Sequence, residues 1–90
     1  MRDSQVPTRQ REFALREVGQ EFQLVRTTDD MAAFLNNSAV MVWHLCTGEM
    51  TVGDIKGLLK DSFPKSGTAI DEDVEAVLKM LSEHGAIRMS

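Results

Sequence analysis

The sequence predicts a single α+β domain in which a three-stranded antiparallel sheet precedes three helices. Apolar residues alternate with polar or small residues between positions 12 and 35, which is the period of strands. After Asn36 the apolar residues recur three and four positions apart, which is the period of helices. The composition, with 42% hydrophobic and 27% charged residues, is typical of a globular protein that folds.

The order of these elements favours a winged-helix-like arrangement, in which the helices pack on one face of a small sheet. Ninety residues allow one hydrophobic core. Residues 1–10 are polar, include Pro7 and show no periodicity. We therefore expect a flexible N-terminal tail over residues 1–10 and the folded domain over residues 11–90.

The first two strands are predicted to form a β-hairpin. Residues 12–18 and 21–27 each alternate apolar and polar side chains, and Gly19-Gln20 between them supplies a short turn. Thr28-Asp29-Asp30 offers a second turn, because Asp side chains can hydrogen-bond to the nearby backbone. A third strand, residues 31–35, then completes the meander.

The third strand places Met31, Ala33 and Leu35 on one face and Ala32 and Phe34 on the other. As the last strand of an open meander it has unpaired N–H and C=O groups, which Lys or Pro usually protects from pairing. This strand contains neither residue. It is a candidate to receive a strand from a partner, and an ordinary covered edge is the alternative.

The first two helices are predicted from their caps. Asn36-Asn37-Ser38 begins the first helix and Gly48 closes it. Thr51-Val52-Gly53-Asp54 has the form of a capping box for the second helix, which Phe63-Pro64 ends. Residues 65–68 are expected to form a flexible surface loop.

The third helix shows the clearest helical period in the chain. Its first turn is expected to carry an acidic cluster, which would complement the helix dipole. Gly85 ends the helix, and residues 86–89 are apolar enough to return to the core as a short strand. The acidic cluster consists of Asp71, Glu72, Asp73 and Glu75, and the apolar face consists of Val74, Val77, Leu78 and Leu81.

Catalysis requires several polar groups that converge at one place, and this sequence offers few of them. His84 is interpreted as a residue that contacts the last carbonyls of the third helix, and Cys46 as a small core residue. His44 and Cys46 lie two apart on a helix and are too few for a structural zinc site. The acidic cluster lacks the ligand spacing and the glycine of a calcium loop. We predict no enzymatic activity, no metal and no cofactor.

Charge and hydropathy exclude two classes of partner. The net charge is −4 and the ten Lys and Arg residues are scattered, which argues against nucleic-acid binding. The N-terminus has no apolar signal region, and residues 39–43, the longest apolar run, cannot cross a bilayer. A lone cysteine fits a reducing compartment. We therefore expect a cytoplasmic protein without a membrane partner.

The order and spacing of these residues resemble the PqqD family between about residues 12 and 89. A helix that ends in Leu-Cys-x-Gly, followed at once by Thr-Val and an acidic-Ile pair, is the most specific part. The sequence departs from the usual family pattern at Thr47, where Asp is common, and at the polar residues 36–38. The residues that carry the resemblance are Leu35-Asn36, Val42-Trp43-His44-Leu45-Cys46-Thr47-Gly48, Thr51-Val52-Gly53-Asp54-Ile55, Leu58-Leu59, Phe63, Asp73-Val74, Val77-Leu78, Leu81 and Gly85-Ala86-Ile87.

The resemblance implies a RiPP recognition element, which binds the leader of a ribosomally made precursor peptide and presents it to a modifying enzyme. The enzyme would be a radical SAM enzyme of pyrroloquinoline quinone biosynthesis or of a related pathway, or another peptide-modifying enzyme. In such domains the leader adds a strand to the third strand of the sheet and lies in a groove walled by the third helix. The implied peptide-binding residues are Asp30, Met31, Ala32, Ala33, Phe34 and Leu35 on the strand, and Val74, Val77, Leu78 and Leu81 on the helix.

Two alternatives remain open at this point. A winged-helix DNA-binding regulator would use the third helix for recognition, although residues 71–75 would bring four carboxylates toward the phosphates. A structural domain could instead pair its open strand edge with a second copy of itself, which leaves a homodimer open.

Overall fold

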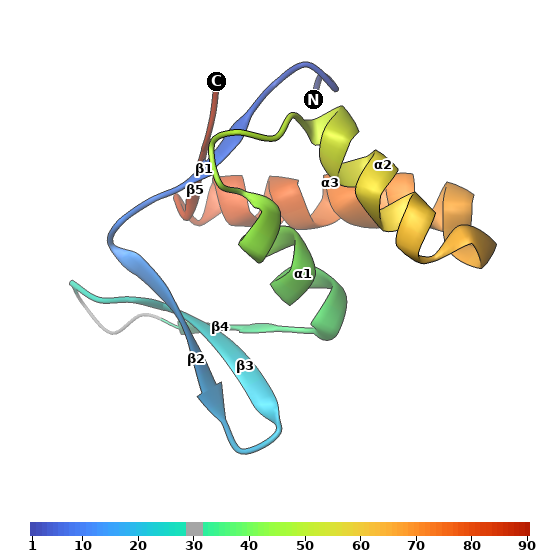
Figure 1. Ribbon diagram of the computed structural model, residues 1–90. Helices are drawn as coiled ribbons and strands as arrows, with labels where there is room; N and C mark the ends of the chain where they lie inside the picture. Colours follow the sequence, from blue (N-terminus) through green and yellow to red (C-terminus); the bar gives the residue numbers. More distant parts are fainter. Residues whose placement is uncertain (29–31) are drawn as a thin grey trace.

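Five strands and three α-helices form the part of the chain, residues 1–28 and 32–90, that this computed structural model describes (Figure 1). Three of the strands make one antiparallel sheet, ordered β2-β3-β4, and the other two pair as a separate ribbon, β1-β5. The predicted α+β class, with a three-stranded antiparallel sheet and three helices, is confirmed.

The three-stranded sheet consists of β2 (Phe13–Val18), β3 (Glu21–Arg26) and β4 (Ala32–Leu35). Val18 pairs with Glu21, so β2 and β3 form the predicted hairpin, and Gly19 at its tip has a φ of 63°. That angle lies in the left-handed region, which glycine adopts without the steric cost that a Cβ brings.

The first and last strands form a ribbon that joins the two ends of the chain. β1 (Pro7–Arg9) pairs with β5 (Ile87–Met89), and the amides of Val6 and Ser90 each donate to the other residue's carbonyl at 3.1 Å. The sequence predicted the short strand at the end. It did not predict β1, because three residues that include a proline show no alternation.

The first two helices, α1 (Asn37–Leu45) and α2 (Val52–Ser62), start at the predicted caps. The Asn36 side chain accepts from the Ala39 amide, and Thr51 and Asp54 form a complete capping box. The expected end of α1 at Gly48 is wrong, since α1 stops at Leu45. Gly48, with a φ of 87°, instead lets the chain pass β1, where its amide donates to the Pro7 carbonyl.

The third helix, α3 (Gly67–Glu83), begins before the acidic residues that were expected in its first turn. A short 3₁₀ turn, η1 (Pro64–Ser66), leads directly into it, so the flexible loop predicted over residues 65–68 is wrong. Proline is favoured in the first turn of a helix, and here it starts a turn that continues into α3. The acidic cluster consequently lies beyond the first turn, where the dipole argument for it weakens.

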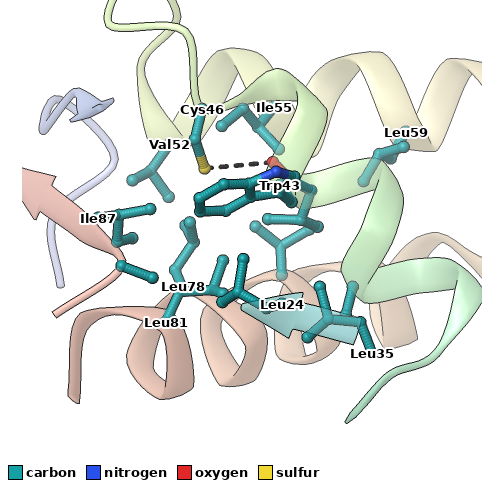
Figure 2. Close-up of a cluster of buried hydrophobic side chains, with 14 of the residues drawn as sticks. Leu24, Leu35, Trp43, Cys46, Val52, Ile55, Leu59, Leu78, Leu81 and Ile87 are labelled. Atoms are coloured by element: carbon teal, nitrogen blue, oxygen red, sulfur yellow. Dashed lines mark hydrogen bonds between the residues drawn. The ribbon is translucent and has the colours of Figure 1, made fainter. Parts of the chain in front are cut away.

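The core lies between the inner face of the sheet and the three helices (Figure 2). Leu24 and Leu35 enter it from the sheet, and Leu78 and Leu81 enter it from α3. Val25 is also buried, although it lies outside this cluster. The strand pairing puts Ala33 and Leu35 on the inner face and Phe34 on the outer one. The prediction that Phe34 lies on the opposite face from Ala33 and Leu35 is confirmed.

Candidate functional site

The edge strand β4 is the first part of the candidate site. Within residues 1–28 and 32–90, β4 pairs with β3 on one side, and no strand pairs with its other side. Backbone groups along that side are the usual template for an added strand. Of the expected strand residues, Ala32 to Leu35 lie in β4, whereas Asp30 and Met31 lie outside the described residues.

The predicted wall residues on α3 do not form one surface. Val74, Leu78 and Leu81 are at most 1% exposed and belong to the core. Val77 is partly buried and packs against that core, so it alone of these four residues retains exposed surface. A periodicity of apolar residues cannot separate these cases, because a core residue and a residue that flanks the core recur at the same spacing.

Ion pairs show which side of α3 faces α2. Lys60 Nζ on α2 lies 2.7 Å from Asp71 Oδ1, and Lys56 Nζ lies 3.1 Å from Glu75 Oε2. On a helix, residues three, four and seven positions apart share a face. Asp71 and Glu75 therefore lie along the border of the buried face of α3 that is next to α2. The other border of that buried face turns away from α2.

The border that turns away from α2 carries four residues spaced three and four apart. Val77 and Met80 are half-buried, while Asp73 and His84 are exposed. His84 Nδ1 donates to the Met80 carbonyl oxygen at 2.8 Å, which confirms the predicted contact with the last carbonyls of the helix. We call this row the α3 flank; it consists of Asp73, Val77, Met80 and His84.

His84, at one end of the α3 flank, faces β4 across a small hollow of about 70 Å³. Ala32 and Ala33 line it from β4 and His84 lines it from the end of α3. The small Ala33 side chain, on the inner face of β4, leaves this space open, whereas a larger residue at that position would fill it. The lining is completed from the other two strands of the sheet by Phe13 on β2 and by Leu24 and Arg26 on β3.

Asp73, Met80 and His84 were missed by the sequence analysis as candidate site residues. His84 was interpreted only as a residue that contacts the last carbonyls of the third helix. Asp73 lies four positions before Val77, and Met80 and His84 lie three and seven positions after it. This spacing places the four residues on one face of the helix. That spacing was available in the sequence, but which side of the helix faces the sheet was not.

The thiol of Cys46 is not a reactive centre. Its Sγ donates to the Val42 carbonyl oxygen at 3.2 Å, and the side chain is fully buried (Figure 2). Burial raises the pKa of this thiol to about 12, and the positive charge of Arg9 offsets only part of that shift. The interpretation of Cys46 as a core residue is therefore confirmed.

Comparison with known proteins adds one positive finding. The family model of coenzyme PQQ synthesis protein D (PqqD) matches residues 24–87, which is most of the chain. None of the curated proteins and none of the solved structures matches it.

Among the helices the structure describes, none is long and apolar enough to cross a membrane. In the same residues, no group of three or more His, Cys, Asp or Glu side chains could hold a metal ion.

The residues that the family model matches include β4, the three helices and the whole α3 flank. The chain therefore belongs to the PqqD family, whose members are non-catalytic peptide-binding proteins of pyrroloquinoline quinone biosynthesis.

Proposed function

We propose that this chain binds the leader of a ribosomally made precursor peptide as an additional strand on β4 and presents it to a peptide-modifying enzyme. The enzyme would be a radical SAM enzyme of pyrroloquinoline quinone biosynthesis or of a related pathway. The observation that carries the proposal is the position of β4, whose unpaired side and small side chains adjoin the α3 flank.

In strand addition, affinity and selectivity come from different contacts. Main-chain hydrogen bonds to β4 supply affinity with little demand on the leader's sequence, and side chains on alternate leader residues supply selectivity. Leader residues on the inner face would meet Val77 and Met80. Those on the outer face would meet Phe34, which is 68% exposed.

The antiparallel pairing of the sheet suggests a direction for the peptide. Arg26 and His84 line the hollow at the Ala32 end of β4, whereas Asp73 lies at the other end of the flank. All described strand pairs in this sheet are antiparallel. A leader that follows the same rule places its C-terminal residues at the Ala32 end of β4 and its N-terminal residues at the Leu35 end.

Tethering accounts for the function without catalytic groups in this chain. A bound leader holds the rest of the precursor near the enzyme and raises its effective concentration at the active site. The leader must become ordered on binding, which lowers the affinity obtained from a given interface. We therefore expect moderate affinity and reversible exchange of the peptide.

The test is calorimetric titration with the synthetic pyrroloquinoline quinone precursor peptide and with versions N-methylated at single leader positions. N-methylation removes one backbone donor and leaves the side chain in place. Because strand pairing uses every second backbone amide, methylation should weaken binding at alternate positions and have little effect between them. A uniform effect, or none, would show that binding does not use strand addition.

Matched variants of the protein locate the strand. Ala33→Phe fills the space between β4 and His84 and should reduce affinity at least tenfold. Ala14→Phe places the same side chain on the exposed outer face of β2 and should leave affinity unchanged. Equal affinities for the two variants would contradict binding at β4, provided that circular dichroism shows both to be folded.

A further inference from the structure

An apolar pocket of about 170 Å³ lies at the far end of the α3 flank from the β4 hollow. Its base consists of buried side chains from all three helices, among them Val42, Leu59 and Val74. Met41 and Ile70 add further apolar surface. A cavity of 150 Å³ with such a lining admits a benzene ring, so this pocket can hold one large apolar side chain.

The mouth of the pocket is open to solvent and partly aromatic. Phe63, at the end of α2, is 46% exposed and forms one wall. Ser38 and Ser66 are exposed on the rim. The exposed part of Phe63 is apolar surface in contact with water, and a ligand that entered the pocket would cover it.

The pocket is continuous with the proposed peptide path. Ser38 and Met41 belong to the first turns of α1, which follows directly from the Leu35 end of β4. Asp73, the first residue of the α3 flank, also lines the pocket. A leader that pairs with β4 and runs on past Leu35 therefore passes this opening.

We infer that this pocket takes one bulky apolar side chain of the leader, Leu, Met or Phe, from the segment beyond the strand-paired residues. This inference rests on the proposed function. For a leader antiparallel to β4, the anchoring residue lies on the N-terminal side of the paired segment. Among the described residues Asp73 has no ion-pair partner, and its carboxylate on the rim favours Lys or Arg next to the anchor in the leader.

The pocket thereby gives the interface a selective contact that main-chain pairing cannot supply. Backbone hydrogen bonds accept nearly any sequence, whereas an enclosed apolar site discriminates by the size of the inserted side chain. Removal of the anchor from the leader should weaken binding about tenfold or more, because burial of such a side chain contributes that much affinity.

The experiment uses the full chain with ¹³C-labelled methyl groups and the synthetic pyrroloquinoline quinone precursor peptide. The peptide is supplied intact and with each apolar leader residue replaced singly by Ser. The methyl resonances of Met41, Val42 and Val74 should shift with the intact peptide. One Ser replacement should abolish those shifts and weaken binding about tenfold, while backbone shifts in β4 remain.

Two serine variants provide the matched control. Ser66→Phe places a ring at the pocket rim and should lower affinity for the intact peptide but not for the anchorless one. Ser62→Phe adds the same ring on the exposed side of α2, outside the pocket, and should change neither. Peptide binding with shifts in β4 but none at the pocket methyls would overturn the anchor while leaving strand addition intact. No binding of any peptide would overturn the proposed function itself.

Discussion

At the scale of single residues, burial determines what Cys46 can do. The thiol lies in the core, donates to the Val42 carbonyl and has a pKa raised to about 12 by desolvation. Four pH units below that value, only about one thiol in 10⁴ is ionised, and the thiolate is the reactive form. Although His44 lies two positions from Cys46 in the sequence, Cys46 is therefore not a nucleophile in the folded protein.

Cys46 should accordingly resist alkylation in the native protein. At pH 8 we expect iodoacetamide to modify it only in urea concentrations that unfold the chain, as followed by mass spectrometry. Rapid modification of the native protein at the rate of a free thiol would contradict the buried position.

The same residue predicts a pH dependence of stability. The unfolded thiol ionises near pH 9 and the folded thiol near pH 12, so the unfolded state loses its proton first. The free energy of unfolding should therefore fall as pH rises from 9 to 12. Cys46→Ala should lose about 1–2 kcal/mol at pH 7 through lost packing and show a weaker alkaline decline. Urea titrations at pH 7, 9 and 10.5 measure both effects.

At the scale of elements, α2 contains two glycines in different surroundings. A Cβ at Gly57 would meet no atom within 4 Å, whereas a Cβ at Gly53 would lie 3.3 Å from Asp3 Cβ and 3.4 Å from the Asp3 carbonyl oxygen. The Gly53 amide also donates to that carbonyl at 2.9 Å. The N-terminal segment thus packs directly against α2 at one glycine and not at the other.

The two alanine substitutions should differ in their effect on stability. Gly57→Ala should raise the free energy of unfolding by about 0.5–1 kcal/mol, because alanine loses less backbone entropy in a helix. Gly53→Ala should gain less or lose stability, because the new methyl group presses on Asp3. Urea denaturation of both variants measures the difference. An equal gain would mean that the N-terminal segment does not pack on α2 in solution.

How far the elements could be predicted depended on how local their signals are. The capping box of Thr51 and Asp54 fixed the start of α2 because its hydrogen bonds join residues three apart. The start of α3 was missed because Pro64 reads as a stop, while in the structure it opens a turn that feeds the helix. β1 was missed because its partner, β5, lies at the other end of the chain.

The candidate site likewise combines features with local sequence signals and features that depend on tertiary packing. Alternation separates the two faces of β4, so Phe34 was correctly placed on the face opposite Ala33 and Leu35. The side of α3 that turns toward the sheet depends on tertiary packing, and Lys56 and Lys60 reveal it only through their partners on α3. Three of the four helix residues expected to contact the peptide are core residues for that reason.

At the scale of the whole molecule, Lys56 joins three parts of the fold. Its ammonium lies 2.8 Å from Asp3 Oδ1 in the N-terminal segment and 3.1 Å from Glu75 Oε2 on α3. The hydrogen bond to Asp3 is the main cause of the raised pKa of Lys56, and burial opposes it. This residue thus ties the first residues of the chain to both long helices.

Replacement of Lys56 by Met should therefore destabilise the protein at neutral pH. Because the folded pKa is raised above 10.5, the charged lysine contributes its full stabilisation below that pH. The contribution is lost as pH rises through the folded pKa. The difference between the wild-type protein and Lys56→Met should shrink above pH 10.5 in urea titrations. Lys79→Met, at an exposed position on α3, is the control and should show no such pH dependence.

An NMR titration can show whether a peptide adds to β4 beside the α3 flank. The ¹⁵N-labelled chain is titrated with the synthetic pyrroloquinoline quinone precursor peptide, and the backbone amide shifts are followed. If the peptide adds to β4, we expect the amide shifts to be concentrated in Ala32 to Leu35 and along Val77 to His84. The amides of β1 and β5 should be unchanged. An unchanged spectrum at high peptide excess, or shifts confined to surfaces away from β4, would contradict peptide addition to β4.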